Sequence, residues 1–412
     1  MDYQQTIDWL FTQTPVFQRD GASAYKPGLE TVTRLCDAFG SPHKRLRCIH
    51  VAGTNGKGST ASTLAAIFQS AGLKTALYTS PHLVDFRERM RVNGKMISHD
   101  RVVDFISRYH EANLKLQPSF FELTTAMAFE WFDDEKVDIA VIEVGLGGRL
   151  DSTNIITPEV SVITNISPDH TALLGSSPAE IAAEKAGIIK PGVPVVIGDA
   201  SDPAVRAVFE AKASENGSEI RFASPLVAVK LPNGGWDYPQ EGLHGELDGD
   251  FQPQNMATVL EVMKFFPEIP HSAIANGFAN VMSLTGLRGR MTRTKLPDGR
   301  TLIYDTGHNP GAWQYLGKEL SAIPELTMIV GFAADKDVAT ILRLLPRNAD
   351  YIFTRPEGNR GLDPEILRQM ALEIGLDGRV ADSVAAALAL PSTQTIFVGG
   401  SNFIVAQLPV YC

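Results

Sequence analysis

Residues 47–60 read Arg-Cys-Ile-His-Val-Ala-Gly-Thr-Asn-Gly-Lys-Gly-Ser-Thr, a short apolar run that leads into a glycine-rich turn. Helical periodicity follows from Ser59 to Ser70. A strand, a flexible turn and a helix start in this order are typical of a phosphate-binding loop, because the N–H groups of the turn and the helix dipole both attract anions. Lys57 adds a positive charge. The candidate nucleotide contacts are Gly53, Thr54, Asn55, Gly56, Lys57, Gly58, Ser59 and Thr60.

The loop is a variant of the strict pattern G-x-x-x-x-G-K-[ST]. Val51 stands where the pattern has its first glycine, and Gly58 stands where it has a hydroxyl residue. The alternative interpretation is a glycine-rich turn that binds no ligand. We favour the phosphate loop because a strand, a lysine, hydroxyl residues and a helix occur together.

Strand and helix patterns alternate outward from this loop along most of the 412 residues. Apolar runs predict strands at 47–52, 74–78, 137–144, 160–165, 194–197, 302–305, 327–332, 351–354 and 395–398. Periodicity predicts helices at 59–70, 102–116, 122–132, 254–266 and 271–282. Continuous β-branched strands separated by helices indicate a parallel sheet covered on both faces.

The order of these patterns predicts an α/β protein of two domains. Residues 215–250 hold short apolar stretches among Gly, Pro and Asp, which indicates a small β-rich excursion. The alternation restarts after Gly286. We therefore expect a domain at 1–285 with the phosphate loop and a mostly parallel sheet, and a smaller Rossmann-like α/β domain at 286–412.

The composition excludes several classes of protein. The net charge is −10 and no Lys/Arg-rich run occurs, so a general nucleic-acid binder is not expected. Three cysteines without CxxC or zinc-type spacing indicate free thiols in a reducing compartment. The polar N-terminus resembles no signal peptide, and no apolar run reaches the length of about 18 residues that a membrane span needs. These features predict a cytoplasmic protein.

Polar side chains follow the apolar strands beyond the loop. Glu143 ends one predicted strand, and parallel sheets bind ligands beyond the carboxyl ends of their strands. Glu143 is therefore a candidate Mg²⁺ ligand in the manner of a Walker-B carboxylate, whereas the alternative is an acid at a solvent-facing strand end. His170 follows the next strand, and Lys185 lies in an alanine-rich helical stretch. Taken alone, His170 is more often structural and Lys185 is more often an exposed lysine.

Together these segments resemble one family. Gly-Thr-Asn-Gly-Lys at 53–57 resembles the loop of the Mur ligase superfamily, and its extension Gly-Lys-Gly-Ser is similar to that of folylpolyglutamate and dihydrofolate synthases. The stretch 143–154, then Asp169-His170, then Glu-Lys-Ala-Gly-Ile at 184–188 match the family in order and spacing. The resemblance implies that Glu143 and His170 bind Mg²⁺ and that Lys185 carries a carbamate. It implies Lys57, Lys185 and His170 as the catalytic residues.

The resemblance implies further residues on the substrate side, namely Arg19, Pro81, His82, Phe86, Asp151 and Ser401. The Thr-Ser-Pro-His-Leu loop at 79–83 is similar to a family loop that borders the folate site, which implies Ser80 as a metal ligand. For the aromatic side chains of this loop, ordinary packing is the alternative. Arg19 would face a glutamate carboxylate, although Asp20 stands where many relatives have a small apolar residue.

The C-terminal part carries similar signals. Leu-Arg-Gly-Arg-Met at 287–291 is similar to a family Pro-Gly-Arg-Met segment, with Arg288 where proline is usual. Residues 304–311 resemble the family's Asp-Gly-Ala-His-Asn-Pro, from which Thr306-Gly307 departs. The resemblance implies these additional nucleotide contacts: Asn255, Arg290, Asp305 and His308.

The family implies an ATP-dependent carboxylate–amine ligase of folate biosynthesis and one-carbon metabolism. A carboxylate of folate or dihydropteroate would attack the γ-phosphate of ATP, and the amine of L-glutamate would then attack the acyl phosphate. The implied cofactors are ATP and Mg²⁺, with two ions expected. The implied partners are these small molecules, without nucleic acid or membrane, and the chain is expected to be a monomer.

Alternatives stay open at this point. One is another Mur-type amino-acid ligase, for instance one acting on cell-wall precursors, which the Ser-Pro-His-Leu loop disfavours. A second is a nucleotide-binding regulator that has lost ligation, and a third is a simple kinase or GTPase. Lys57, Glu143, His170 and Lys185 together favour the ligase. Whether one or both synthase activities are present is not settled by the sequence.

Overall fold

The computed structural model describes residues 1–21, 28–356, 358 and 360–409. The chain folds into two compact units. The first comprises Met1–Val229, Asp237–Glu246 and Pro253–Leu287, and the second comprises Lys230–Trp236, Leu247–Gln252 and Arg288–Cys412. Two short segments that precede residue 285 thus belong to the second unit, which the sequence did not indicate.

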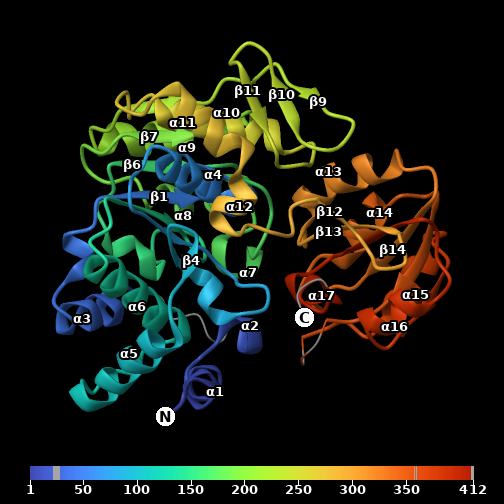
Figure 1. Cartoon of the computed structure of the whole chain (residues 1–412), viewed down its shortest axis with the longest axis horizontal. Coiled ribbons are helices and arrows are strands. Elements are labelled where there is room, and N and C mark those ends of the chain that lie inside the picture. The colour runs from blue at the N-terminus through green and yellow to red at the C-terminus, as the bar shows by residue number, and fades with distance from the viewer. Residues whose placement is uncertain (22–27, 357, 359, 410–412) are drawn as a thin grey trace. The chain divides into compact units, whose positions relative to one another are not determined.

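The first unit, as far as the structure describes it, is built on an eight-stranded sheet of order β4-β3-β2-β5-β1-β6-β7-β8 (Figure 1). The strands are β1 (Cys48–Ala52), β2 (Thr75–Tyr78), β3 (Met90–Val92), β4 (Lys95–Met96), β5 (Ile139–Glu143), β6 (Val160–Ile163), β7 (Val195–Ile197) and β8 (Ile220–Phe222). From β2 to β8 the neighbours run parallel, whereas β3 and β4 pair antiparallel at one edge. The predicted parallel sheet is confirmed.

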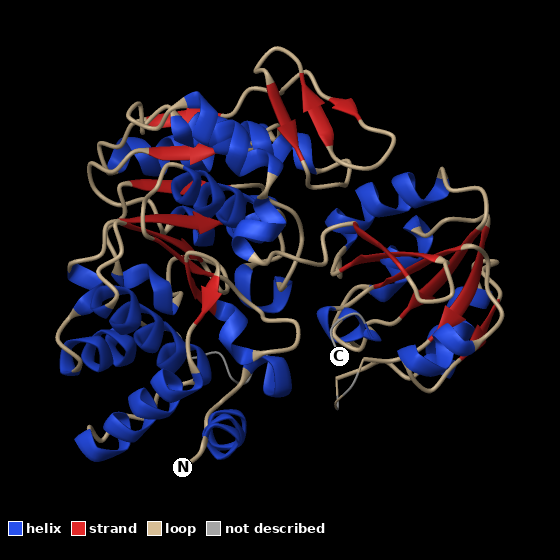
Figure 2. Cartoon of the chain, in the orientation of Figure 1, coloured by secondary structure: helices blue, strands red, loops and turns tan. Residues whose placement is uncertain are grey.

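Helices cover both faces of this sheet (Figure 2). The described helices before the second sheet are α1 (Tyr3–Gln13), α2 (Phe17–Asp20), α3 (Glu30–Ala38), α4 (Lys57–Ser70), α5 (His99–Ala112), α6 (Phe120–Asp134), α7 (Thr171–Leu174), α8 (Pro178–Ala186), α9 (Pro203–Glu215), α10 (Gln252–Met263), α11 (His271–Ala279) and α12 (Val281–Thr285). The hydroxyl of Ser119 accepts the N–H of Glu122, and the carboxylate of Glu122 accepts the N–H of Ser119, a capping box that fixes where α6 begins. The single helix predicted at 271–282 was wrong, because Asn280 at φ −137° and ψ 30° separates α11 from α12.

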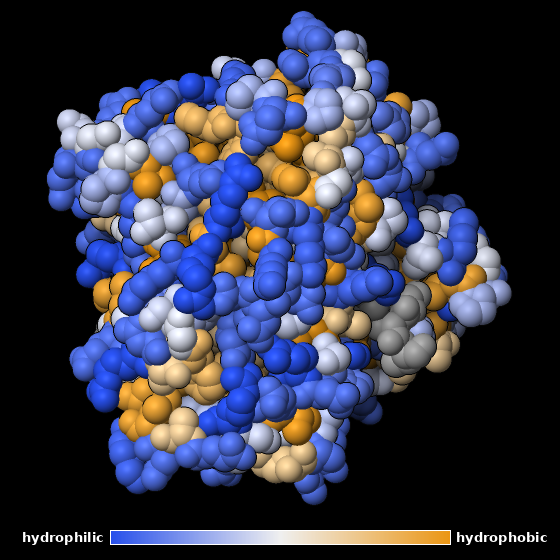
Figure 3. Space-filling view, turned by 60° about the vertical axis from the view of Figure 1, so that its left-hand side comes forward, coloured by the Kyte–Doolittle hydropathy of each residue, from blue (hydrophilic) through white to orange (hydrophobic). Residues whose placement is uncertain are grey.

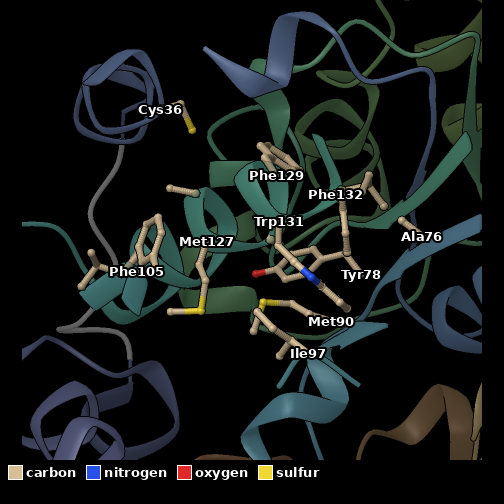
Figure 4. Close-up of a cluster of buried hydrophobic side chains, with 14 of the residues drawn as sticks. Cys36, Ala76, Tyr78, Met90, Ile97, Phe105, Met127, Phe129, Trp131 and Phe132 are labelled. Atoms are coloured by element: carbon tan, nitrogen blue, oxygen red, sulfur yellow. The ribbon is translucent and has the colours of Figure 1, made fainter. Parts of the chain in front are cut away.

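Alternate side chains of the strands enter a hydrophobic core beneath α6. In Figure 4, Phe129 and Phe132 of α6 lie in one cluster with Ala76 and Tyr78 of β2. Farther along the sheet, α8 and α9 bury Ala182 and Phe209 against β6 and β7. Helix α4 packs on β1, β2 and β5 and is buried over most of its length. This packing fixes the start of α4 beyond the carboxyl end of β1.

The predicted β-rich excursion lies within 215–250. Strand β8 joins the main sheet, while β9 (Val229–Lys230), β10 (Trp236–Tyr238) and β11 (Leu243–Gly245) form a separate sheet of order β11-β10-β9.

The described part of the second unit is built on a six-stranded sheet of order β12-β13-β17-β14-β15-β16. Its elements are β12 (Thr292–Lys295), β13 (Thr301–Asp305), α13 (Pro310–Ser321), β14 (Leu326–Val330), α14 (Val338–Leu344), β15 (Ala349–Phe353), α15 (Pro364–Leu372), β16 (Gly378–Val380), α16 (Val384–Ala389), β17 (Thr395–Gly399) and α17 (Asn402–Val405). Only β12 runs antiparallel to its neighbour. Trp313 is buried in the core against Phe332 and Phe397. The predicted smaller α/β fold is confirmed.

Ion pairs hold the segments 230–236 and 247–252 in the second unit. Nζ of Lys230 pairs with Glu319 and lies 2.9 Å from Oδ1 of Asp250. Nε of Arg293 lies 2.7 Å from Oδ2 of Asp248. The Glu319 and Asp248 side chains are each only 7% exposed, so these cations offset the cost of burying the two carboxylates.

Hydrophilic side chains cover most of the face drawn in Figure 3, with hydrophobic side chains between them. Within the described part of the chain, no helix is both long and apolar enough to cross a membrane.

Candidate active site

The predicted phosphate loop joins β1 to α4, and two of its glycines have positive φ angles. The φ angle is 146° at Gly53 and 84° at Gly56. A Cβ at Gly53 would lie 1.8 Å from Oγ1 of Thr164, and a Cβ at Gly56 would lie 2.2 Å from Oδ1 of Asn255. Both positions require glycine, for the backbone conformation and for the close approach. Asn255 of α10, an implied nucleotide contact, thus lies directly against the loop.

Lys57 begins α4 and folds back over the loop. Its Nζ donates to the carbonyl oxygens of Gly53 at 3.0 Å and Thr54 at 3.1 Å. Ser59 and Thr60 lie in the first turn and are buried. The start of α4 thus combines a positive helix end, an ammonium group and two hydroxyls.

Glu143 ends the strand beside the loop. Strand β5 pairs with β1 in a register that places Glu143 opposite Val51, two residues before Gly53. The Glu143 side chain is 3% exposed, and its Oε2 accepts the N–H of Ser80 at 3.0 Å. The predicted metal ligands Glu143 and Ser80 are therefore neighbours beside the phosphate loop.

This donor set fits Mg²⁺, which prefers carboxylate and hydroxyl oxygens. In the described ranges, no group of three or more His, Cys, Asp or Glu side chains forms a metal cluster.

Lys185 of α8 is buried, so the exposed-lysine alternative was wrong. Burial and the positive charge of Lys57 lower the pKa of Lys185 to about 7, against the opposing effect of Asp169 and Asp151. These four side chains therefore lie close enough for their charges to interact. The amine of Lys185 is therefore more readily neutral, and more nucleophilic, near neutral pH than the amine of an exposed lysine.

His170 precedes α7 with a left-handed backbone, at a φ of 50°. Its N–H donates to Oδ1 of Asp169 at 2.9 Å, and its Nε2 lies 3.8 Å from the same oxygen. Asp169 is thus next to His170 and also acts electrostatically on Lys185.

A buried polar chain, missed by the sequence reasoning, holds Asp151. Its carboxylate accepts the N–H of Thr153 at 3.0 Å, the hydroxyl of Thr153 at 2.5 Å and the N–H of Leu146 at 2.8 Å. Nε2 of His50 lies 2.8 Å from Oγ1 of Thr153. Burial raises the pKa of Asp151 and lowers the pKa of His50 to about 3. The one feature of the sequence that could have indicated this buried polar chain is a histidine, His50, inside the apolar strand β1.

The loop after β2 carries the predicted residues Ser80, Pro81, His82 and Phe86, of which Pro81 is exposed. Nδ1 of His82 accepts a hydrogen bond from Nε of Arg89 at 2.7 Å, and burial together with this guanidinium holds the pKa of His82 well below its ordinary value. Phe86 is 3% exposed and packs edge-on against Phe120 in the core. Arg89, for which no role was predicted, is buried with its guanidinium 5.1 Å from the centre of the Phe120 ring.

Arg19 is engaged by neighbours within the N-terminal segment. Its Nε and Nη2 donate to the two oxygens of Asp20 at 2.5 and 2.6 Å, and its Nη2 also reaches the carbonyl of Thr14 at 3.3 Å. The hydrogen bond with Asp20 raises the pKa of Arg19. In this structure the guanidinium of Arg19 is bound by the carboxylate of Asp20, the residue at which the chain departs from the family pattern.

The second unit gathers its predicted nucleotide residues at the end of β13. Asp305 accepts the N–H of Met291 at 2.8 Å and that of Gly307 at 2.7 Å, and burial raises its pKa. Nη1 of Arg290 donates to the hydroxyl of Thr306 at 2.5 Å. Nδ1 of His308 lies 3.0 Å from the carbonyl oxygen of Thr306. Thr306, one of the departures from the family pattern, thus contacts both predicted phosphate-side residues.

Ser401 lies at the end of β17 and is buried. Its hydroxyl accepts the N–H of Phe403 at 3.2 Å and caps α17.

Comparison with known proteins identifies similar sequences and structures. The family model of the Mur ligase middle domain matches residues 51–225, and that of the Mur ligase glutamate ligase domain matches residues 289–401. Folylpolyglutamate synthase of Lacticaseibacillus casei is 33% identical over 99% of this chain and 98% of its own.

Two solved structures show the same architecture. Escherichia coli FolC in complex with DHPP and ADP superposes with a TM-score of 0.84 at 30% identity, over 98% of this chain and 96% of the other. A bifunctional folylpolyglutamate synthase/dihydrofolate synthase with Mn, AMPPNP and L-glutamate bound has a TM-score of 0.82 at 29% identity, over 98% and 97% of the two chains.

Proposed function

Because this chain belongs to the folylpolyglutamate synthase and dihydrofolate synthase family of Mur-type ATP-dependent ligases, we propose that it adds L-glutamate to a folate, to dihydropteroate or to both. The observation that carries the proposal is the register of β1 with β5, which sets the buried carboxylate of Glu143 beside the phosphate loop. The bound DHPP, ADP, AMPPNP and L-glutamate of the two similar structures support the same substrates here.

In the proposed reaction the acceptor carboxylate attacks the γ-phosphorus of ATP and ADP leaves. The neutral amine of L-glutamate then attacks the acyl carbon, the amide bond forms as the nitrogen loses a proton, and inorganic phosphate leaves with its bonding electron pair. Lys57 would neutralise charge on the phosphoryl oxygens during the transfer. Mg²⁺, for which we propose two ions, would supply Lewis-acid stabilisation of those oxygens. Glu143, Ser80 and His170 are the proposed protein ligands.

We propose that Lys185 becomes carbamylated. Its buried amine, with a pKa of about 7, supports the reaction with CO₂ that an ordinary protonated lysine resists. The neutral amine would form an N–C bond to CO₂ and release one proton. The resulting carbamate would place a negative charge next to Lys57, which now lowers the pKa of Lys185.

For the second unit we propose that Arg290, Asp305 and His308 contact the nucleotide and that Ser401 approaches the amino acid. A guanidinium matches phosphate geometry, and Thr306 orients Arg290 for that contact. We also propose a role for each predicted domain. Residues 1–285 would bind ATP and the acceptor, and residues 286–412 would serve glutamate ligation. The active chain is proposed to be a monomer.

The test is ATP turnover with Mg²⁺ and L-glutamate, run in parallel with dihydropteroate and with a reduced folate. We expect acceptor-dependent ADP release and a product heavier by one glutamyl residue. Turnover with a cell-wall precursor in place of both acceptors would contradict the proposal, as would tight ATP binding without turnover of any acceptor.

A further inference from the structure

The segment that follows β6, residues 164–167, is hydrogen-bonded to the phosphate loop at several successive positions. Thr54 donates its N–H to the carbonyl oxygen of Asn165 at 2.9 Å. The next residue, Asn55, donates its N–H to Oδ1 of the same asparagine, also at 2.9 Å. Asn165 therefore binds two consecutive N–H groups of the loop, one through its main chain and one through its side chain.

Neighbouring residues complete the contact. The hydroxyl of Thr164 donates to the carbonyl oxygen of Asn55 at 2.6 Å. The hydroxyl of Thr54 donates to the carbonyl oxygen of Ser167 and accepts the N–H of Ser167, both at 3.1 Å. Gly53 passes so close to Thr164 that no side chain fits between them. We call residues 164–167 the loop brace.

The brace is itself anchored in the sheet. The N–H of Thr164 donates to the carbonyl of Ala52 at 2.9 Å, which extends the β1–β6 pairing by one residue. The carbonyl of Thr164 accepts the N–H of Asp199 at 2.9 Å. The brace is therefore fixed to the central strands. Its hydrogen bonds restrict the conformation of a loop that contains two glycines with positive φ.

We propose that Asn165 is a positioning residue for the nucleotide, and that the brace directs the N–H groups of Thr54 and Asn55 away from the phosphates. The phosphate cradle then begins at Gly56 and continues into the first turn of α4. This inference rests on the proposed use of ATP. It adds Asn165 to the residues that position the nucleotide, and it assigns different roles to different residues of the loop. Thr54 and Asn55 hold the loop in place, while Gly56, Lys57 and Gly58 face the anion.

The physical basis is preorganisation. A glycine-rich loop has many backbone conformations, and fixing one of them upon binding would weaken nucleotide affinity. Hydrogen bonds that fix the loop beforehand remove that cost. Loss of the Oδ1 contact would also leave the N–H of Asn55 without its partner inside the site, which adds to the effect.

The experiment measures the Kd of ADP by calorimetry for the full chain and for variants. Asn165→Ala is expected to raise this Kd about tenfold, the equivalent of one hydrogen bond to a partly buried donor. Asn216→Ala is the control, because the side chain of Asn216 also bonds the main chain away from the loop, with its Nδ2 donating to the carbonyl oxygen of Ile189 at 2.7 Å. The control should leave the Kd of ADP unchanged whatever it does to the melting temperature.

A second pair of variants tests the brace if Asn165→Ala does not fold. Thr164→Val removes the hydroxyl at nearly constant volume, and Thr164→Ser retains it. We expect the valine variant to weaken ADP binding severalfold and the serine variant to restore it, with the KM of L-glutamate unchanged in both. Equal ADP affinity in wild type, Asn165→Ala and Thr164→Val would overturn the inference. Failure of the wild-type chain to bind ADP would instead overturn the proposed function.

Discussion

Nε2 of His50 lies 2.8 Å from Oγ1 of Thr153, 103 residues later in the chain, and this contact fixes which atoms carry the protons. The hydroxyl of Thr153 donates to Asp151 at 2.5 Å, so His50 donates to Thr153 and is protonated at Nε2. In the described residues, Nδ1 of His50 is buried without a hydrogen-bond partner. His50 is therefore a neutral residue beneath the site, and its charged form is strongly disfavoured.

This arrangement predicts a stability that depends on pH. The folded pKa of His50 is about 3 and the ordinary value is 6.5, so below pH 6.5 the unfolded chain binds a proton that the folded chain does not. Stability from this group is present above pH 6.5 and falls as the pH drops toward 3. Between pH 7 and pH 5 the loss is about 2 kcal/mol.

The check is urea unfolding of wild type and His50→Gln at both pH values. Glutamine retains an N–H donor without the titration, so the variant should lack that loss of about 2 kcal/mol. Identical pH dependence in the two proteins would contradict the buried neutral histidine.

Gly56→Ala should abolish most nucleotide binding, because its Cβ would lie 2.2 Å from Oδ1 of Asn255. Gly72 is the matched control, since it has the same φ of 84° and, among the described residues, a Cβ added there would meet no atom within 4 Å. Gly72→Ala therefore tests the left-handed conformation alone, at about 1–2 kcal/mol of stability. We expect the Kd of ADP to rise more than about tenfold only in Gly56→Ala. An equal effect of both variants would mean that strain, rather than contact with Asn255, decides binding.

Glu143→Gln should remove Mg²⁺-dependent turnover while preserving the fold. Glutamine can still accept the N–H of Ser80, but it lacks the negative charge that attracts the ion. We expect kcat to fall about a hundredfold and the Mg²⁺ concentration for half activity to rise. Glu159→Gln makes the same chemical change at an ion pair with Arg47 that is 39% exposed, and it should behave as wild type. Normal turnover of Glu143→Gln would place the metal elsewhere.

Lys185 should react with CO₂ at neutral pH. Its pKa of about 7 makes the neutral fraction rise between pH 6 and pH 8, a range in which an exposed lysine stays protonated. We expect a carbamate signal in ¹³C NMR spectra recorded with labelled bicarbonate, growing over that range and absent in Lys185→Met. A signal that persists in the variant would come from another amine.

Thr306→Val should weaken nucleotide use by loosening Arg290. The hydroxyl of Thr306 accepts from Arg290 at 2.5 Å, and valine keeps the volume while removing the acceptor. We expect the KM of ATP to rise about fivefold, the equivalent of the net contribution of about one hydrogen bond, with kcat less affected. Thr306→Ser should restore the wild-type value. A lowered kcat with unchanged KM would assign Thr306 to a different step.

Features coded by adjacent residues could be predicted from the sequence. The strand, loop and helix at 47–70 are contiguous, and each signal supports the next. The burial of Lys185 could not be read from its alanine-rich helix, because burial depends on which face of α8 meets β6 and β7. The edge hairpin β3–β4 was missed, since its strands of three and two residues are too short to show a pattern and owe their conformation to pairing with β2.

Contacts between residues that are distant in the sequence could not be predicted from it. Asn165 lies at a predicted strand tip, and nothing in its neighbours indicates that its amide faces residue 55. Arg19 and Asp20 are adjacent, so their pairing could have been anticipated as a competitor for the proposed glutamate contact. Phe86 was expected at the pocket with packing as the alternative, and the structure buries it against Phe120.

The ion pairs of Lys230 and Asp248 have a consequence for how this protein can be divided. A fragment that begins at residue 288 would lack both side chains, and among the described residues it would leave the buried Glu319 with Arg293, at 3.9 Å, as its remaining ion-pair partner. Recombination between relatives at a single junction near residue 287 would likewise separate the paired charges of Lys230 and Glu319 and of Asp248 and Arg293. Exchange that carries residues 230–252 along with the C-terminal part keeps them together. The part of the sequence that must be inherited together is therefore made of separate segments of one continuous chain.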